Sequence, residues 1–104
     1  MDEMKLVDEE VSRAIVAWSG KGRSSHPARD SSAVLSEFGR TLGEALMRRV
    51  LDLENDFYLS NAHLEEPDLV QMGLRAASEF SERHPEIDKA AVDALEWCYT
   101  YDYK

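Results

Sequence analysis

One apolar stripe at helical spacing runs through residues 30–59 and constrains the fold more than any other feature of this sequence. After the first pair, its members recur at steps of three and four, which places them on one side of an α-helix. They are Val34, Leu35, Phe38, Leu42, Leu46, Val50, Leu53 and Phe57. Asp30, Ser31 and Ser32 are suitable N-cap residues just before this stripe. We therefore predict one long helix over residues 31–59.

Three shorter segments also have a helical pattern and can cover the apolar side of the long helix. They span residues 3–18, 67–83 and 86–101. Pro67 suits the first position of a helix, and Pro85 disfavours helical geometry at the residue before it. A chain of 104 residues has the size of one domain. The prediction is an all-α, compact bundle of about four helices that forms a single domain over residues 1–104.

Two glycines inside the predicted long helix call for an explanation. Gly39 and Gly43 are four residues apart, and each costs about 1 kcal/mol relative to alanine in a helix interior. Such a pair favours close approach of another backbone, for which the small residues Ala90, Ala91 and Ala94 are the predicted neighbours. The alternative is a weak or kinked helix near Gly43.

The charge of the chain is large and uneven. Residues 1–50 carry eight basic and eight acidic side chains, whereas residues 51–104 carry four basic and thirteen acidic ones, so the second half holds the whole net charge of −9. This charge disfavours nucleic acid as a partner and favours a protein with a basic surface. The alternative is that the acidic surface serves only solubility.

No catalytic or metal-binding pattern is present in the sequence. The di-iron carboxylate pattern needs Glu three residues before His, but those positions hold Arg23, Ser60 and Ser81. Cys98, the single cysteine, lies on the apolar side of its predicted helix, where a buried and unreactive thiol is expected. We therefore predict a protein that is not an enzyme and that needs no metal and no cofactor.

Aromatic residues crowd the C-terminal segment. Trp97, Tyr99, Tyr101 and Tyr103 lie within seven residues and cannot all face inward, so at least one tyrosine should lie near the surface. Tyrosine and tryptophan are enriched at protein-binding hot spots. The predicted partner-binding residues are these aromatics together with acidic residues of the second half: Asp52, Asp56, Glu65, Glu66, Asp68, Trp97, Tyr99, Tyr101 and Tyr103. The alternative is that the aromatic segment closes one end of the core.

The loop over residues 19–30 is basic, and it suggests an alternative anion-binding site. Its candidate residues are Lys21, Arg23, His26 and Arg29. The Gly20-Lys21-Gly22 sequence does not match a phosphate-binding Walker loop, because that pattern places both glycines before the lysine.

These observations together predict a non-enzymatic, acidic protein-binding module. It would inhibit a basic partner protein, as an immunity or antitoxin protein neutralises a nuclease toxin. The alternative function is a homodimeric helical regulator or adaptor that contacts nucleic acid or another anion through the loop from Lys21 to Arg29. The sequence shows no signal-peptide pattern and no membrane-spanning apolar run, so we expect a cytoplasmic protein.

Overall fold

Aspartate caps begin three of the described helices, and Gly20 and Gly39 end two of them. The structure, a computed structural model, describes residues 5–104, and within that range the chain is helical and has no strand. The helices are α1 (Asp8–Ser19), α2 (Ser31–Phe38), α3 (Arg40–Phe57), α4 (Ala62–Glu65), α5 (Leu69–Arg83) and α6 (Lys89–Tyr103). The side chains of Asp30, Asp68 and Asp88 accept hydrogen bonds from backbone N–H groups at the starts of α2, α5 and α6. The all-α prediction is confirmed.

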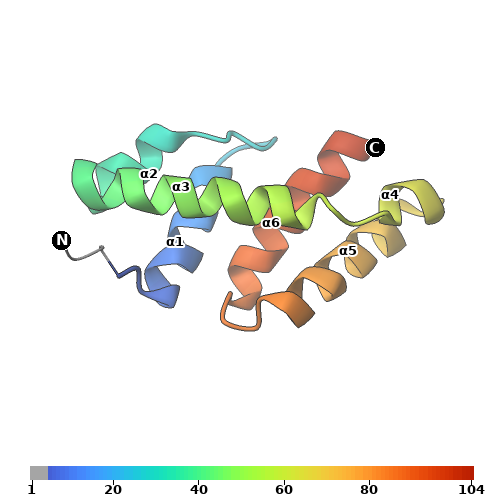
Figure 1. The fold of residues 1–104 in the computed structure, drawn as a ribbon. Helices are drawn as coiled ribbons and strands as arrows, with labels where there is room; N and C mark the ends of the chain where they lie inside the picture. Colours follow the sequence, from blue (N-terminus) through green and yellow to red (C-terminus); the bar gives the residue numbers. More distant parts are fainter. Residues whose placement is uncertain (1–4) are drawn as a thin grey trace.

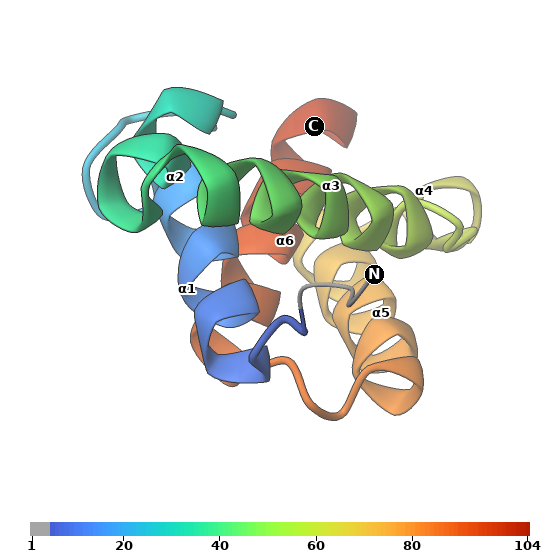
Figure 2. The same ribbon diagram turned by 60° about the vertical axis from the view of Figure 1, so that its left-hand side comes forward.

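The helices pack in two layers. In Figures 1 and 2, α1, α6 and α5 lie side by side, and the long helix α3 crosses over them. The short helix α2 lies beside α3 above α1, and α4 lies at the opposite end of α3, next to the start of α5. The molecule is elongated, with extents of 46 × 29 × 18 Å. The ends of α3 therefore reach two well-separated parts of the surface.

An aromatic cluster fills the core where α3, α5 and α6 meet. The ring of Phe57 lies 5.3 Å from that of Phe80 and 5.5 Å from that of Tyr99, and all three side chains are fully buried. At the other end of the core, Ile15, Leu46 and Val34 join α1, α3 and α2. Among the described residues, every buried side-chain nitrogen and oxygen atom has a hydrogen-bond partner. Contacts between helices and these hydrogen bonds therefore account for the buried side chains of the described residues.

The predicted helix over residues 31–59 is wrong in one respect, because it is two helices that meet at Gly39. This glycine adopts φ 80° and ψ 166°, a conformation that ends α2 and starts α3 and that other residues rarely adopt. Gly43 lies against α2: a Cβ there would be 3.0 Å from the Cα of Leu35. The expected close approach at Gly43 is confirmed, but its partner is α2 rather than Ala90, Ala91 and Ala94 of α6.

The other helix boundaries also differ from the predicted ones. In the segment predicted as residues 3–18, residues 3 and 4 lie outside the described part of the chain, residues 5–7 are not helical, and α1 starts at Asp8. The segment predicted as residues 67–83 starts at Leu69, and the segment predicted as 86–101 spans Lys89–Tyr103. The single turn α4 was not predicted. It matters most for the surface described below.

Cys98 is expected to resist thiol reagents in the folded protein. Its side chain is fully buried, as the sequence predicts, and burial raises the pKa of its thiol to about 11. Because the thiolate is the reactive form, labelling by a disulfide reagent at pH 8 should require unfolding. Labelling kinetics with and without denaturant measure this; rapid stoichiometric labelling of native protein would contradict the burial.

Candidate protein-binding surface

Helix α4 is held in place from inside the molecule by Tyr99. The buried Tyr99 hydroxyl donates a hydrogen bond to the Ser60 carbonyl oxygen (3.2 Å) and accepts one from the His63 backbone N–H (2.9 Å). The Ser60 hydroxyl accepts a hydrogen bond from the Ala62 N–H at the first residue of α4. These bonds satisfy the backbone groups of a turn too short to be stable by itself. Tyr99 therefore positions α4.

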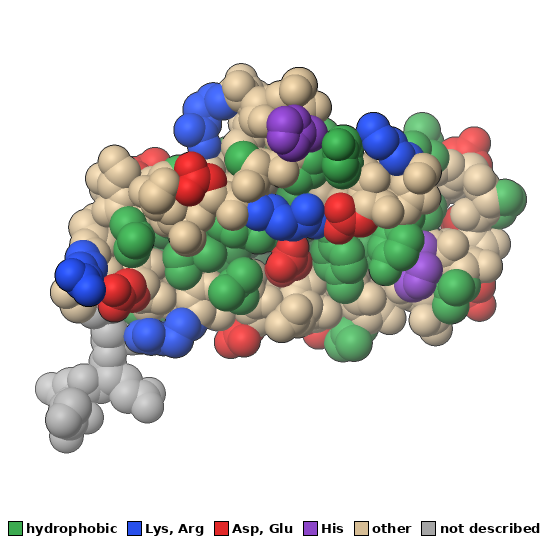
Figure 3. Space-filling model, turned by 90° about the horizontal axis from the view of Figure 1, so that it is seen from above, with side chains coloured by type: hydrophobic (Ala, Val, Ile, Leu, Met, Phe, Trp, Pro, Cys, Tyr) green, Lys and Arg blue, Asp and Glu red, His purple; other side chains and the backbone are tan. Residues whose placement is uncertain are grey.

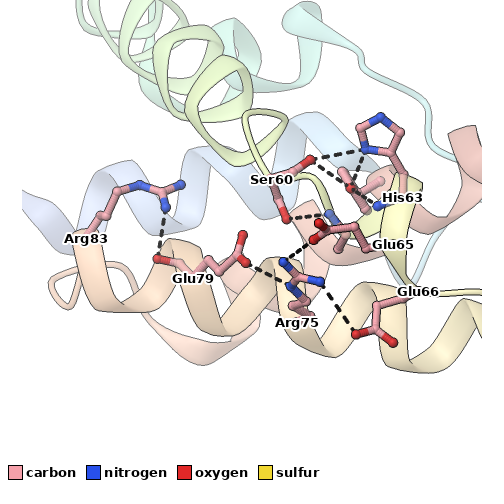
Figure 4. A network of polar contacts seen from close by, with 9 residues as sticks. Ser60, His63, Glu65, Glu66, Arg75, Glu79 and Arg83 are labelled. Atoms are coloured by element: carbon pink, nitrogen blue, oxygen red, sulfur yellow. Dashed lines mark hydrogen bonds and ion pairs between the residues drawn. The ribbon is translucent and has the colours of Figure 1, made fainter.

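An arginine of α5 fixes α4 from the outside. Arg75 pairs with Glu65 at 2.5 Å and with Glu66 at 3.6 Å, and it also pairs with Glu79 one turn along α5 at 3.1 Å. Figure 4 shows its guanidinium group between these carboxylates. One positive charge faces three negative ones, so this network keeps a net negative charge. It holds Glu65 and Glu66 at the edge of the exposed region around α4.

Large hydrophobic side chains gather around α4 and are exposed. We define the α4 surface as Leu59, Leu64, Leu69, Val70 and Tyr103, which belong to α4, its flanking turns, the start of α5 and the end of α6. Leu59, Leu64 and Val70 are 72%, 74% and 65% exposed. At this end of the molecule, on the right in Figure 3, hydrophobic and acidic side chains lie beside one another.

A hollow of about 400 Å³ is lined by two residues of the α4 surface, Leu69 and Tyr103. Its walls include Leu69, Met72 and Tyr103, and the ring of Tyr103 stacks on His63 with 4.2 Å between the ring centres. Glu66 also lines the hollow, and Asp68 caps α5 beside it. An exposed apolar patch with a charged border is typical of a surface that binds another macromolecule.

The structure brings together four of the predicted partner-binding residues, namely Glu65, Glu66, Asp68 and Tyr103. The other predicted residues do not belong to this exposed group, although the ring centre of Tyr99 lies 4.8 Å from that of Tyr103. Asp52 is exposed on α3, Trp97 is half-buried beside Lys21, Tyr101 lies against His26, and Tyr99 is buried beneath α4.

The four aliphatic residues of the α4 surface were not predicted as binding residues from the sequence. Leu59 and Leu64 lie at and beyond the end of the helix predicted over residues 31–59, and Leu69 and Val70 lie in the first turn of the helix predicted over residues 67–83. The available signal was their density, since four large apolar residues lie within residues 59–70.

Asp56, another predicted partner-binding residue, has a structural role. Its carboxylate accepts a hydrogen bond from Arg83 Nε at 2.9 Å and lies 2.8 Å from His84 Nε2. Partial burial would raise the pKa of this carboxyl group, but the contacts with Arg83 and His84 outweigh burial and hold the pKa below its ordinary value. Asp56 thus links the end of α3 to the end of α5.

The lowered pKa of Asp56 predicts a pH-dependent contribution to stability. A carboxylate with a depressed folded-state pKa stabilises the fold above its ordinary pKa of about 4, and this stabilisation is lost as the pH falls through the folded-state value. We expect Asp56→Asn to cost about 1 kcal/mol at pH 7 and clearly less at pH 3. Urea unfolding at both pH values measures the two costs, and equal costs would contradict this role.

The basic loop is tied to the protein's own carboxylates. Arg29 donates hydrogen bonds to Glu54 (3.1 Å), Asp102 (2.6 Å) and the Tyr58 hydroxyl (2.9 Å), and its backbone has φ 49°. Arg23 donates to the Ala17 carbonyl oxygen. An anion would have to compete with two carboxylates for Arg29, so the geometry does not favour the anion-binding alternative. The loop instead joins α3 to the end of α6.

Within residues 5–104, no group of three or more His, Cys, Asp and Glu side chains is arranged to hold a metal ion. In the same range, no helix combines the length and apolar character needed to cross a membrane. Comparison with protein-family models, curated proteins and solved structures found no match to this chain.

Proposed function

We propose that this protein is a protein-binding module and that the α4 surface is its binding site. The observation that carries the proposal is the gathering of exposed Leu59, Leu64, Leu69, Val70 and Tyr103 at one end of the molecule, bordered by Glu65, Glu66 and Asp68. Burial of the apolar side chains would supply most of the affinity, and the acidic border would attract a basic partner. The complementary partner has an apolar patch surrounded by Lys and Arg.

We further propose that binding inhibits the partner, as an immunity or antitoxin protein neutralises a nuclease toxin. The support is the net charge of −9, carried by the second half of the chain. A nuclease holds its substrate on a basic surface, which an acidic protein of this size can cover. With the purified partner, inhibition would appear as loss of its activity at an equimolar ratio. Undiminished activity in a saturated complex would refute inhibition but not binding.

The binding proposal is tested first by identifying the partner and then by measuring its association rate. The tagged protein is purified from cells that express it, and the captured protein is produced separately for stopped-flow measurements. We expect the association rate to fall at least about tenfold between roughly 50 and 500 mM salt, because screening weakens charge steering. A salt-independent rate would contradict steering by the acidic border.

A light-scattering measurement of the free protein is the accompanying control. We expect a monomer, because the acidic border repels a second copy of the same surface. A dimer that disappears when the α4 surface is made polar would instead support the homodimer alternative and overturn the proposal of a basic partner.

A further inference from the structure

A groove between α5 and α6 continues the α4 surface along the molecule. Val70 and Leu74 are four residues apart on α5, are 65% and 50% exposed, and point to the same side of that helix. Leu74 lines a hollow of about 390 Å³ together with Ile87 and Val92. We call this hollow the α5/α6 groove. An apolar path thus leads from the α4 surface into the α5/α6 groove.

The wall of the α5/α6 groove contains a carboxylate whose charge is poorly compensated. Glu96 is half-buried, and within residues 5–104 its carboxylate makes no hydrogen bond or ion pair, although its backbone carbonyl oxygen accepts a hydrogen bond from the Thr100 hydroxyl. Its Oε2 atom lies over α5, where a Cβ on Gly73 would be only 2.9 Å away. Burial and then the nearby charge of Asp93 raise the pKa of Glu96. The folded protein therefore bears a cost for keeping this carboxylate ionised.

The charged neighbours of Glu96 do not remove this cost. Lys89 is bound to Asp93, with 3.0 Å between Nζ and Oδ2. Lys21 lines a second hollow of about 310 Å³ on the other side of Glu96, together with Trp97 and Thr100. Both lysines lower the pKa of Glu96, but less than burial and Asp93 raise it. A cation placed in the α5/α6 groove would offset the unfavourable charge.

We propose that the α5/α6 groove binds a cationic amphipathic helix of the partner, whose Lys or Arg side chain pairs with Glu96. Apolar residues of that helix at positions i and i+4 contact Leu74 and Val92, the arrangement in which amphipathic helices bind grooves between two helices. Charge complementarity selects this occupant, since an acidic helix would add to the repulsion at Glu96 and Asp93. The inference rests on the proposed protein-binding function and extends the same interface along Val70 and Leu74.

The experiment uses a synthetic amphipathic helical peptide with leucines on one face and lysines on the other. Its dissociation constant is measured for the wild type, Glu96→Gln and Glu82→Gln. Glu82→Gln is the matched control. Glu82 is exposed on α5 and does not line the groove, and its substitution changes the net charge by the same amount as Glu96→Gln. We expect Glu96→Gln to weaken binding at least about fivefold and Glu82→Gln less than about twofold.

Two spectroscopic measurements locate the bound peptide and the paired charge. Amide shift changes should centre on Leu74, Val92 and Glu96, and the pKa of Glu96 should fall when the peptide is added, because a bound cation favours the ionised carboxylate. A peptide in which glutamates replace the lysines should not bind. Equal weakening by both variants would show general attraction to an acidic protein and would overturn the inference, as would shift changes confined to other helices.

Affinity measurements with the natural partner distinguish this inference from the proposed function. If changes in the α4 surface abolish its binding while Glu96→Gln leaves its affinity unchanged, the α4 surface stands and the cationic helix in the groove is refuted. If changes in the α4 surface leave its affinity unchanged, the proposed function fails, whatever the peptide does.

Discussion

Replacing Phe57 with alanine is expected to destabilise the protein by about 3–5 kcal/mol, the range for truncation of a buried phenylalanine. Phe57 is fully buried at the end of α3 and packs against Phe80 of α5 and Tyr99 of α6. Its loss leaves a cavity where three helices meet, and typical domains are stable by only about 5–15 kcal/mol. Urea unfolding followed by circular dichroism measures the difference.

Two further variants test whether the loss of stability comes from the buried volume of Phe57. Phe57→Leu retains most of the volume and should cost less than Phe57→Ala, whereas Leu51→Ala removes an exposed side chain from the same helix and should change stability by less than about 0.5 kcal/mol. If Phe57→Ala cost no more than Leu51→Ala, the aromatic cluster would not be the centre of the core.

Replacing Leu64 and Val70 together with serine is expected to weaken partner binding at least about 100-fold. Both side chains belong to the α4 surface and are largely exposed, so the change should leave the fold intact. Burial of an aliphatic side chain of this size contributes about 1.5–3 kcal/mol, and 1.4 kcal/mol is a factor of ten in affinity. Titration calorimetry with the purified partner measures the loss.

The matched control for the α4 surface is Leu51→Ser. Leu51 is another exposed leucine, 44% accessible, but it lies on α3 outside the α4 surface. Neither substitution changes the net charge, so charge steering is the same in all proteins compared. We expect the control to bind with wild-type affinity. Equal affinities of the control and the double variant would show that the partner does not contact the α4 surface.

Much of the fold was predictable because helical periodicity and caps are local features. Val11, Ala14 and Trp18 of α1 and Leu46, Val50 and Leu53 of α3 are buried as their spacing indicates. The break at Gly39 was not predictable from periodicity, because the apolar stripe continues across it. The backbone conformation of Gly39 turns α2 back towards α3, where Gly43 lies against Leu35.

The candidate site was predictable only in part, because it depends on contacts between distant segments. The acidic residues Glu65, Glu66 and Asp68 were recognised from charge, but their neighbours Leu59 and Leu64 were not. Tyr99 illustrates the difficulty. The aromatic composition of its segment suggests a surface anchor, whereas hydrogen bonds to Ser60 and His63 place Tyr99 beneath α4. A single-turn helix held by tertiary hydrogen bonds leaves no periodic pattern in the sequence.

Hydrogen exchange of the protein with and without its partner shows whether the α4 surface is the binding site. Partner binding should slow exchange in residues 59–74, which include Leu59, Leu64, Leu69 and Val70 of the α4 surface and the start of the α5/α6 groove, and should leave exchange in α1 and α2 unchanged. Protection confined to α1 and α2, with residues 59–74 exchanging as in the free protein, would contradict the proposed binding site.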